Sequence, residues 1–425
     1  MTGECPTADA SLDSGGATDG SPVVDLQDLG FDEGAHLLVG RALARVPPGE
    51  EIAVLGCRPD LTTDLAAWCR REGCEVRLPG PSDARDGRPG GGPRAWVRPG
   101  RRAVDRWSGA ERAGGASPDG VMARPPAHWG LAARGALVEA GGPEMAFDFA
   151  DRDIVWSDMA PALYAHAAAA QWDPATAVPW DSPFTLPDAV EQAVVVQIMT
   201  YLVENEQAAL IIPARLLARV HPHFREVLQL LAVQAADEAR HIEVFTRRAL
   251  LKGGRMGTSS VGGRASLTTL LAEPDYSLAS FLLSVLGEGS FLNLLAFLDR
   301  HAPDPVTRRV VQLARQDEAR HVAFGIAHLE HQATVDPGLR HRLRAAVERR
   351  HDALADTAGL NQDVTDALIV MAAGEWTPRA IARGHRDVLR LQAQMDEGRQ
   401  RRLVHLGFPY REAADLSALH TRNFM

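Results

Sequence analysis

The pentapeptide Asp-Glu-Ala-Arg-His occurs twice in the chain, at residues 237–241 and again at residues 317–321. In each copy a glutamate, Glu238 or Glu318, stands three positions before the histidine that closes the motif. Residues three apart on an α-helix project to the same side of that helix, so a carboxylate and an imidazole in this arrangement can reach one metal ion together. The repeat therefore predicts two helices that each carry a pair of metal ligands.

The neighbours of both motifs predict that the Glu–His pairs face the protein interior. Leu231, Ile242 and Phe245 share the face of the first pair, and Val311 and Val322 share the face of the second. Charged groups on an apolar face are costly unless something compensates them, and a metal ion does so. One Glu-x-x-His alone is a weak signal, but two identical inward-facing copies are a strong one. They predict a metal site that contains Glu238, His241, Glu318 and His321.

Apolar periodicity around the motifs predicts a bundle of four long helices with further helices after it. A glycine- and serine-rich loop at residues 253–266 separates the second helix from the third, which matches a bundle with a single crossover connection. The four helices are expected at residues 188–220, 224–251, 271–300 and 304–332, and the additional C-terminal helices at about residues 338–400.

The two helices without a motif should each supply one carboxylate. In the third helix Glu288 lies on the same apolar stripe as Val285. The first helix offers Glu206, which shares its face with Met199, and Glu204, whose face is polar. Because these two glutamates point about 200° apart, only a π-bulge would turn Glu204 inward. We take Glu206 as the ligand and keep Glu204 as the reserve.

Four carboxylates and two histidines can hold two divalent metal ions and leave coordination positions open. Such ligands suit iron or manganese, and the helical region has no cysteine for a thiolate-bound zinc or an iron–sulfur cluster. Asp237 and Asp317 are expected to orient the histidines through the second ring nitrogen. Arg240 and Arg320 would neutralise these aspartates. The alternative is that the Asp–Arg pairs are ordinary surface pairs.

Composition excludes several classes of protein. The chain has 425 residues, of which 45% are hydrophobic, so about two or three globular domains are expected. A net charge of −10 argues against nucleic acid or an anionic membrane as the partner. We find no apolar run of about 20 residues and no signal peptide at the acidic, polar start. Because the chain has only 4 cysteines, we expect a cytoplasmic protein without a disulfide scaffold.

Changes in composition along the chain predict its organisation. A strand is expected at residues 94–100 within a Gly/Pro/Arg-rich linker, and the segment 171–180, with its tryptophans and prolines, is expected to cap one end of the bundle. The predicted parts are a disordered leader (1–21), a small α+β domain (22–79), the linker (80–130), a connecting segment (131–186) and a helical domain (187–425).

On these motifs, residues 188–332 resemble the ferritin-like di-iron carboxylate proteins. The form Asp-Glu-x-Arg-His is closest to oxygen-activating members such as bacterial multicomponent monooxygenases and acyl-carrier-protein desaturases. The third histidine of the p-aminobenzoate N-oxygenases is replaced here by Ala314, and the threonine of the monooxygenases by Leu292, so the subfamily stays open. Carried onto this chain, the resemblance implies the ligands Glu206, Glu238, His241, Glu288, Glu318 and His321.

The same resemblance implies an enzyme: a non-haem di-iron oxygenase or oxidase that uses O2 to oxidise or hydroxylate a small organic substrate. Its cofactor would be two iron ions, with manganese as the other metal that fits, and its electrons would come from an external donor. The alternatives are a ferroxidase or metal-handling protein, and a sulfur-relay docking or carrier protein. A homodimer is left open.

The N-terminal domain resembles the TusA/SirA-like sulfur-carrier domains over residues 23–78. The matching pieces are VDLQDLG, RALARVPPGEEIAVLG and RPDLTTDLAAWCRREGCEV. That family carries a Cys-Pro-x-Pro nucleophile after its first strand, whereas residues 31–34 of this chain read Phe-Asp-Glu-Gly. The resemblance therefore implies a docking or packing module that has lost the usual thiol.

Overall fold

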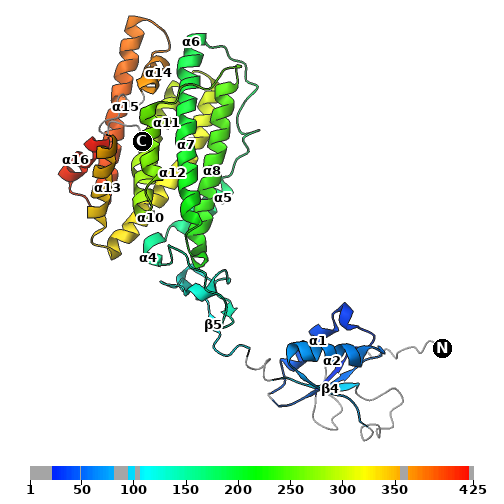
Figure 1. Cartoon of the computed structure of the whole chain (residues 1–425). Coiled ribbons are helices and arrows are strands. Elements are labelled where there is room, and N and C mark those ends of the chain that lie inside the picture. The colour runs from blue at the N-terminus through cyan, green and yellow to red at the C-terminus, as the bar shows by residue number, and fades with distance from the viewer. Residues whose placement is uncertain (1–21, 48, 81–93, 101–105, 355–361, 421–425) are drawn as a thin grey trace. The chain divides into compact units, whose positions relative to one another are not determined.

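The computed structural model describes residues 22–47, 49–80, 94–100, 106–354 and 362–420. The predicted leader at residues 1–21 lies outside the described residues. The chain divides into two compact units, Met1–Arg112 with Leu137–Gly142, and Ala113–Ala136 with Pro143–Met425. The first is small and mixed in secondary structure, and the second is almost entirely helical, as the sequence predicted (Figure 1).

The first unit contains a four-stranded sheet in the order β1-β2-β4-β3. β1 (Val23–Asp25) runs parallel to β2 (Ile52–Leu55), while β4 (Ala95–Arg98) pairs antiparallel with both β2 and β3 (Glu75–Arg77). The strand expected at residues 94–100 is therefore β4, which lies between β2 and β3 rather than in a separate linker.

Two helices complete the hydrophobic core of the first unit. α1 spans Ala35–Leu43, and α2 spans Leu61–Glu72 and ends where Gly73 adopts a left-handed conformation with φ 73°. A glycine there closes the helix without strain on a side chain. Both helices bury one apolar stripe against the sheet. A two-stranded pairing of β5 (Glu111–Arg112) with β6 (Leu137–Val138) also belongs to this unit.

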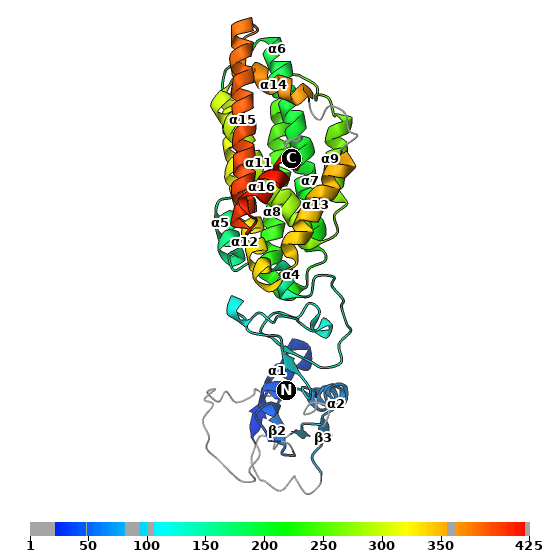
Figure 2. The ribbon, with the colours of Figure 1, turned by 90° about the vertical axis from the view of Figure 1, so that its left-hand side faces the viewer.

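The helical unit is built on four long elements (Figures 1 and 2). The first is a continuous run of α6 (Asp188–Val190), the π-helical η5 (Glu191–Val196) and α7 (Gln197–Leu217), and the second is α8 (Arg225–Leu250). The third comprises α10 (Tyr276–Ser280), the π-helical η7 (Phe281–Glu288) and α11 (Gly289–His301), and the fourth is α12 (Pro305–Val335). α7 packs along α8, α11 packs along α12, and α8 meets α12. This is the predicted ferritin-like four-helix arrangement.

Additional helices surround the four. Two short ones, α4 (Arg152–Val155) and α5 (Ala160–Ala169), precede the bundle, and α5 packs against α8. The predicted additional C-terminal helices are α13 (Leu339–Leu354), α14 (Gln362–Ala373), α15 (Pro378–His405) and α16 (Tyr410–His420). In both views α13, α15 and α16 cover one side of the bundle (Figures 1 and 2).

The prediction of a loop over residues 253–266 was wrong in its second half. A helix, α9, begins at Val261 and ends at Leu271. The Ser260 hydroxyl accepts a hydrogen bond from the Gly263 amide at 2.9 Å, and Leu270 is buried in the core. An N-cap and one buried face are enough to outweigh the low helix propensity of the glycines.

The third long element is more apolar than the sequence analysis recognised. The stretch Tyr276–His301 has 26 residues, and an 18-residue window within it has a mean hydropathy of 1.8, which is long and apolar enough for a membrane span by composition alone. Within the bundle, 83% of that window is buried. Packing in the protein core therefore accounts for its apolar character.

Close contact between η7 and α12 depends on one glycine. A Cβ atom built at Gly325 would lie 2.6 Å from the Cβ of Ser284, which is too close for two carbon atoms. Glycine at this position lets the π-helical segment approach α12 directly. This contact holds the last residue of η7, Glu288, against the second motif helix.

Candidate metal centre

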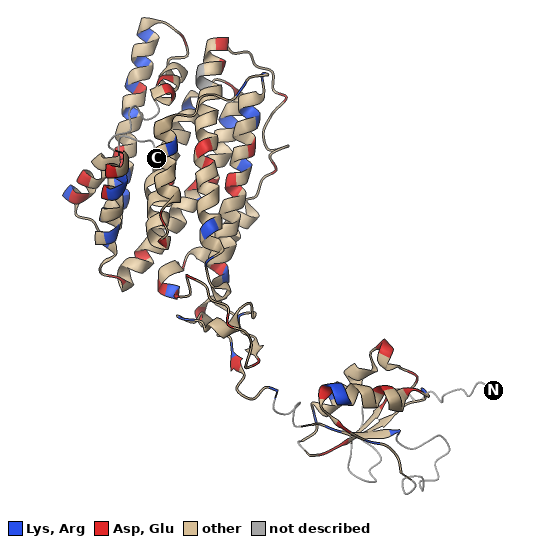
Figure 3. Cartoon of the chain, viewed as in Figure 1, with Lys and Arg blue, Asp and Glu red and all other residues tan. Residues whose placement is uncertain are grey.

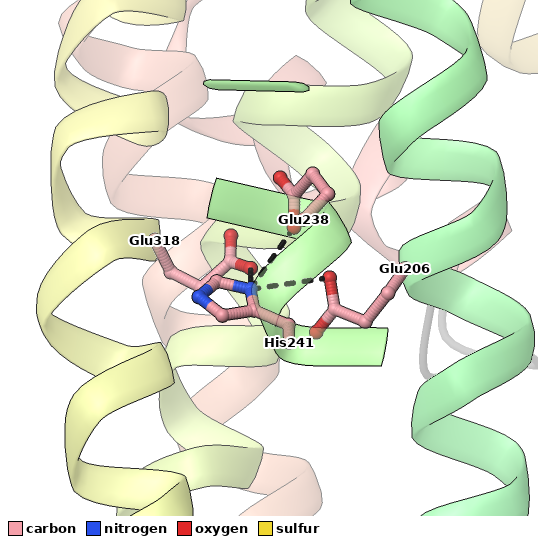
Figure 4. A group of neighbouring side chains, drawn as sticks. All are labelled: Glu206, Glu238, His241 and Glu318. Atoms are coloured by element: carbon pink, nitrogen blue, oxygen red, sulfur yellow. Dashed lines mark hydrogen bonds and ion pairs between the residues drawn. The ribbon is translucent and has the colours of Figure 1, made fainter. Parts of the chain in front are cut away.

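The structure brings all six ligands predicted from the sequence to one place inside the bundle. α7 supplies Glu206, the end of η7 supplies Glu288, and the two motif helices α8 and α12 supply a glutamate and a histidine each. Each of the six residues is at most 2% exposed to solvent. Figure 4 shows four of them, Glu206, Glu238, His241 and Glu318, pointing toward one another.

The six residues form two overlapping groups that could each hold a metal ion. One group contains Glu206 and His241, the other contains Glu288 and His321, and both contain Glu238 and Glu318; within each group the ligand atoms lie within 4.8 Å of one another. The two motif glutamates are therefore shared, and the other four residues belong to one group each. Two metal ions held here would share Glu238 and Glu318 among their ligands.

Both histidines turn the same ring nitrogen toward the carboxylates. Nδ1 of His241 lies 3.0 Å from Glu238 Oε2 and 3.5 Å from both Glu206 Oε2 and Glu318 Oε1 (Figure 4). Nδ1 of His321 lies 3.0 Å from Glu238 Oε1 and 3.5 Å from Glu318 Oε2. One nitrogen of each imidazole is thus available to a metal ion at the centre.

Unpaired polar atoms show that the cluster is incomplete without cations. Each of the four glutamates has one buried carboxylate oxygen that makes no hydrogen bond, and the 3.0 Å contact between Glu238 Oε1 and Nδ1 of His321 is an ion-pair contact without hydrogen-bond geometry. Buried polar atoms in proteins are nearly always hydrogen-bonded, and an unpaired one is costly. Four carboxylates whose free oxygens converge with two imidazole nitrogens fit two divalent cations well.

The pKa shifts of the side chains in the metal-free cluster also fit a site for divalent cations. Burial, together with the neighbouring Glu238 and Glu318, raises the pKa of Glu206 and of Glu288 well above the usual value. Burial alone would lower the pKa of His241, yet the carboxylates around it raise that pKa well above the usual range, and the same holds for His321. Without metal the cluster therefore retains protons, and metal binding would release them.

The second nitrogen of each histidine faces an aspartate of the opposite motif. Nε2 of His241 lies 3.2 Å from Asp317 Oδ2, and Nε2 of His321 lies 3.2 Å from Asp237 Oδ2. The sequence indicated that these aspartates could orient the histidines, but not that the pairs would cross between α8 and α12. Hydrogen bonds of this kind fix the tautomer and the orientation of a ligand histidine.

The motif arginines close the crossed arrangement. Arg240 bonds to Asp237 and Arg320 bonds to Asp317 within each motif. Each guanidinium also approaches the other aspartate, with Arg240 at 3.5 Å from Asp317 and Arg320 at 3.4 Å from Asp237. Both aspartates are almost completely buried. The geometry is therefore that of an internal network and not of surface pairs.

Two residues that the sequence analysis did not assign to the site complete this network. Nε1 of Trp172 donates to Asp317 Oδ2 at 2.8 Å, and the Trp172 ring stacks on His241 with centroids 6.4 Å apart and planes at 15°. Nε2 of Gln171 donates to Asp237 Oδ1 at 3.1 Å. The sequence analysis predicts that the segment 171–180 caps one end of the bundle. In the structure, the first two residues of this segment contact the motif aspartates. The unusual tryptophan and proline content of this segment was the only sequence feature that pointed to a role at the site.

Glu288 has a neutral partner that the sequence analysis also missed. Nε2 of Gln234 donates to Glu288 Oε1 at 3.2 Å. Gln234 lies four residues before Glu238 on α8, so helical spacing alone could have placed it on the same face. The reserve ligand Glu204 is not part of either group. α7 is regular from Gln197 onward, and Glu204 is half-buried on another face of that helix.

Comparison with known proteins gives little beyond distant structural neighbours. No family model matches the chain, and no curated protein matches it. An R2-like ligand-binding oxidase variant with an aerobically reconstituted Mn/Fe cofactor is 17% identical with a TM-score of 0.38, over 63% of this chain and 93% of the other. A second such variant is 18% identical with a TM-score of 0.39, over 62% and 94%. The R2-like ligand-binding oxidase from Sulfolobus acidocaldarius is 15% identical with a TM-score of 0.38, over 57% and 91%.

Because those TM-scores are below 0.5, the fold and the site rest on the geometry of this chain. The fold is a ferritin-like helical bundle, and its centre is a buried cluster of carboxylates and histidines suited to a pair of metal ions.

Proposed function

We propose that the protein is a non-haem di-iron oxidoreductase that uses O2 to oxidise a small organic substrate. The observation that carries this proposal is the pair of metal-ligand groups that share Glu238 and Glu318. A pair of iron ions held there would supply electrons to O2 and the oxidising power for attack on a substrate. Electrons would return from an external donor, because the sequence shows no dinucleotide-binding fingerprint.

The chain's own residues divide this task between two sides of the cluster. Glu206 and Glu288 each belong to one ligand group and retain protons without metal, so each would give up its proton when a metal ion binds. His241 and His321 are held rigidly, because each is tied to an aspartate of the opposite helix. The α8–α12 side would therefore orient the two histidines, and the carboxylates of α7 and η7 would each complete one ligand group.

Burial supports oxidative chemistry at this centre. The six ligands lie deep among apolar side chains such as Phe245, Phe291 and Leu295. A dry surrounding favours reaction with a bound substrate over reaction with water. Four carboxylates and two histidines also leave coordination positions that the protein does not fill.

Metal loading followed by exposure to O2 tests the proposal. We expect two irons per chain after anaerobic addition of Fe²⁺, and we expect Mössbauer and optical spectra to show that both ions are oxidised together by O2. A single iron, or two irons that do not react with O2, would contradict the proposal. Oxidation that continues with added Fe²⁺, with no organic product under any reductant, would instead favour a ferroxidase.

The small N-terminal unit is best proposed as a docking module rather than a sulfur carrier. Residues 31–34, where the sulfur-carrier families have their nucleophile, contain no thiol. Cys69 is fully buried, and burial together with the nearby Cys74 raises the pKa of the Cys69 thiol to about 12. Such a thiol is a poor nucleophile at neutral pH. Incubation with a sulfur donor should leave no persulfide on Cys69.

A further inference from the structure

A second buried cluster of charged groups lies on the outer side of η7 and α11, and it is cationic. α13 contributes Arg350, α15 contributes Arg399 and Arg402, and α16 contributes His420. Arg350, Arg399 and His420 are nearly fully buried. Arg402 is half-buried, but its Nη2 atom is inaccessible to solvent. Further arginines lie in the first half of α15 and near its end (Figure 3).

The hydrogen bonds recorded for the two α15 arginines go to neutral groups. Nε of Arg399 donates to Ser417 Oγ at 3.1 Å, and its Nη1 donates to Ser290 Oγ at 3.2 Å. Nε of Arg402 donates to the carbonyl oxygen of Val285 at 2.7 Å. Hydroxyl and carbonyl oxygens orient a guanidinium, but they do not neutralise its charge.

Among the described residues, acidic side chains close to Arg399, Arg402 and His420 are scarce. Asp396 approaches Arg399 only to 3.9 Å, and its side chain is 35% exposed. Within the described parts of the chain, no acidic side chain forms an ion pair with Arg402 or with His420. Nη2 of Arg402 and Nε2 of His420 are buried and have no hydrogen-bond partner. Buried charges in proteins are normally paired, so the described residues leave Arg402 without the anion expected beside it.

Titration behaviour agrees with missing negative charge. Burial lowers the pKa of Arg399 and of Arg402 to about 10, so both stay cationic at neutral pH. Burial and the charges of Arg350, Arg399 and Arg402 lower the pKa of His420 well below its usual range. The cluster therefore repels a further proton, and it would attract an anion.

The cluster adjoins the metal centre through the helix that carries Glu288. The guanidinium of Arg402 lies flat on Gly289, the residue after Glu288, because a Cβ atom at Gly289 would fall 2.4 Å from Arg402 Nε. The Val285 carbonyl that accepts from Arg402 belongs to the same π-helical segment as Glu288. An anion bound here would rest against the element that holds one of the metal ligands.

We propose that Arg399, Arg402 and His420, with Arg350 beside them, bind the carboxylate or phosphate group of the organic substrate. This inference rests on the proposed oxidation of an organic substrate and specifies its class as a molecule with an anionic group. Guanidinium groups suit this task because their N–H donors match the oxygens of carboxylate and phosphate. An organic anion bound here would lie against η7 and the start of α11, beside the segment that carries Glu288.

Ligand titrations of the full chain test the proposal first without metal. The thermal midpoint of unfolding and the heat of binding are measured in separate titrations. The ligands are hexanoate, hexyl phosphate, hexan-1-ol and inorganic phosphate. We expect saturable binding and a raised midpoint with hexanoate or hexyl phosphate, since a ligand that binds only the folded state stabilises it. Equal effects of hexan-1-ol and the organic anions would overturn the proposal. Binding of inorganic phosphate alone would overturn the assignment to a substrate.

Two neighbouring arginines on α15 provide a matched pair of variants. Arg402→Gln should weaken binding of the organic anion by about 10-fold or more, because it removes a charge-assisted donor. Arg401→Gln removes the same charge from an exposed position and should leave the affinity unchanged. His420→Gln gives a second test if the first variant does not fold. Equal affinities in the Arg402→Gln and Arg401→Gln proteins would contradict the assignment.

The same titrations separate this proposal from the proposed function. Anion binding by the metal-free chain does not depend on any reaction with O2. If organic anions bind but the iron-loaded protein does not react with O2, the anion site stands and the oxidase function fails. If O2 is consumed but none of the anions binds, the function stands and the anion site fails.

Discussion

Two buried clusters of charge on α8 and α12 differ in one decisive respect. Toward the end of α8, Arg248 donates to Glu191 at 2.7 Å, to Asp304 at 2.7 Å and to Thr307 at 2.8 Å, so its guanidinium is fully paired. The metal-ligand cluster, which begins at Glu238 on the same helix, leaves an unpaired oxygen on every carboxylate. Burial of charge therefore does not identify a metal site by itself. What distinguishes the metal-ligand cluster is that its unpaired carboxylate oxygens converge with two imidazole nitrogens.

The largest effect should follow from loss of a carboxylate that both ligand groups share. Glu238→Gln changes one of the two glutamates that both ligand groups share, so we expect metal content to fall from two ions per chain to less than one. Glu243→Gln, an exposed substitution on the same helix, is the control and should retain both ions. Atomic absorption on the purified proteins measures the difference. Two ions retained in Glu238→Gln would show that the shared position of Glu238 is not essential.

A smaller loss is expected from Glu206, which belongs to only one group. Glu206→Ala should lose or strongly weaken one of the two ions and abolish the reaction with O2. Glu204→Ala should be nearly silent, with a stability change of no more than about 0.5 kcal/mol. Metal content decides between them. The assignment is wrong if Glu206→Ala keeps two ions while Glu204→Ala keeps fewer.

Mutation of the fully paired cluster around Arg248 should lower the stability of the protein and leave metal binding intact. Arg248→Met leaves Glu191 and Asp304 buried without their partner, which should destabilise the protein by about 3–5 kcal/mol. Both metal ions should still bind, because no ligand is touched. Arg247→Met, which removes an exposed arginine stacked on Trp180, should cost only about 1 kcal/mol or less. Urea unfolding of the metal-free proteins measures both values, and similar costs would refute the contrast.

A buried histidine with only neutral partners should give a pH effect of intermediate size. Nδ1 of His328 pairs with the Trp156 carbonyl at 3.1 Å and Nε2 with Ser277 Oγ at 3.2 Å. Burial lowers the pKa of His328 from its ordinary value of 6.5 to about 4. The unfolded chain therefore takes up a proton first as the pH falls. The contribution of His328 to stability should be complete above pH 6.5 and should be lost by about pH 4, a change of about 3 kcal/mol.

Comparison of the wild type with His328→Gln isolates this effect from titration of the metal ligands. The difference in their free energies of unfolding, measured without metal, should shrink as the pH is lowered from 6.5 to 4. A difference that is constant over this range would contradict the lowered pKa.

The smallest effect should come from the crossed aspartates. Asp317→Asn keeps the size of the side chain but removes the charge that holds Nε2 of His241. Metal affinity should fall by about 10- to 100-fold, the usual cost of losing such a partner, with no loss of ligands. Competition with a chelator measures the affinity. An unchanged affinity would mean that Trp172 and the helix itself suffice to orient His241.

The sequence predicted the bundle and its six candidate ligands because both depend on local spacing. Helical periodicity placed Glu206 and Glu288 on inward faces without knowledge of the partners. The crossed Asp–His pairs, the hydrogen bond from Trp172 and the cationic cluster depend on contacts between distant helices, for which one sequence has no local signal. The start of α9 was missed for a different reason, since its glycines hid a capped helix.

The crossed pairs also bear on how the centre forms as the chain folds. The histidine of α8 is oriented by an aspartate 76 residues further along the chain, and the histidine of α12 by one 84 residues earlier. Neither copy of the repeated motif can therefore order its own histidine alone, even though each carries all the residue types that the task requires. Contacts over such separations form late, after the closure of long loops. During synthesis the centre cannot assemble until α12 has emerged, so a partly made chain offers iron only unorganised ligands.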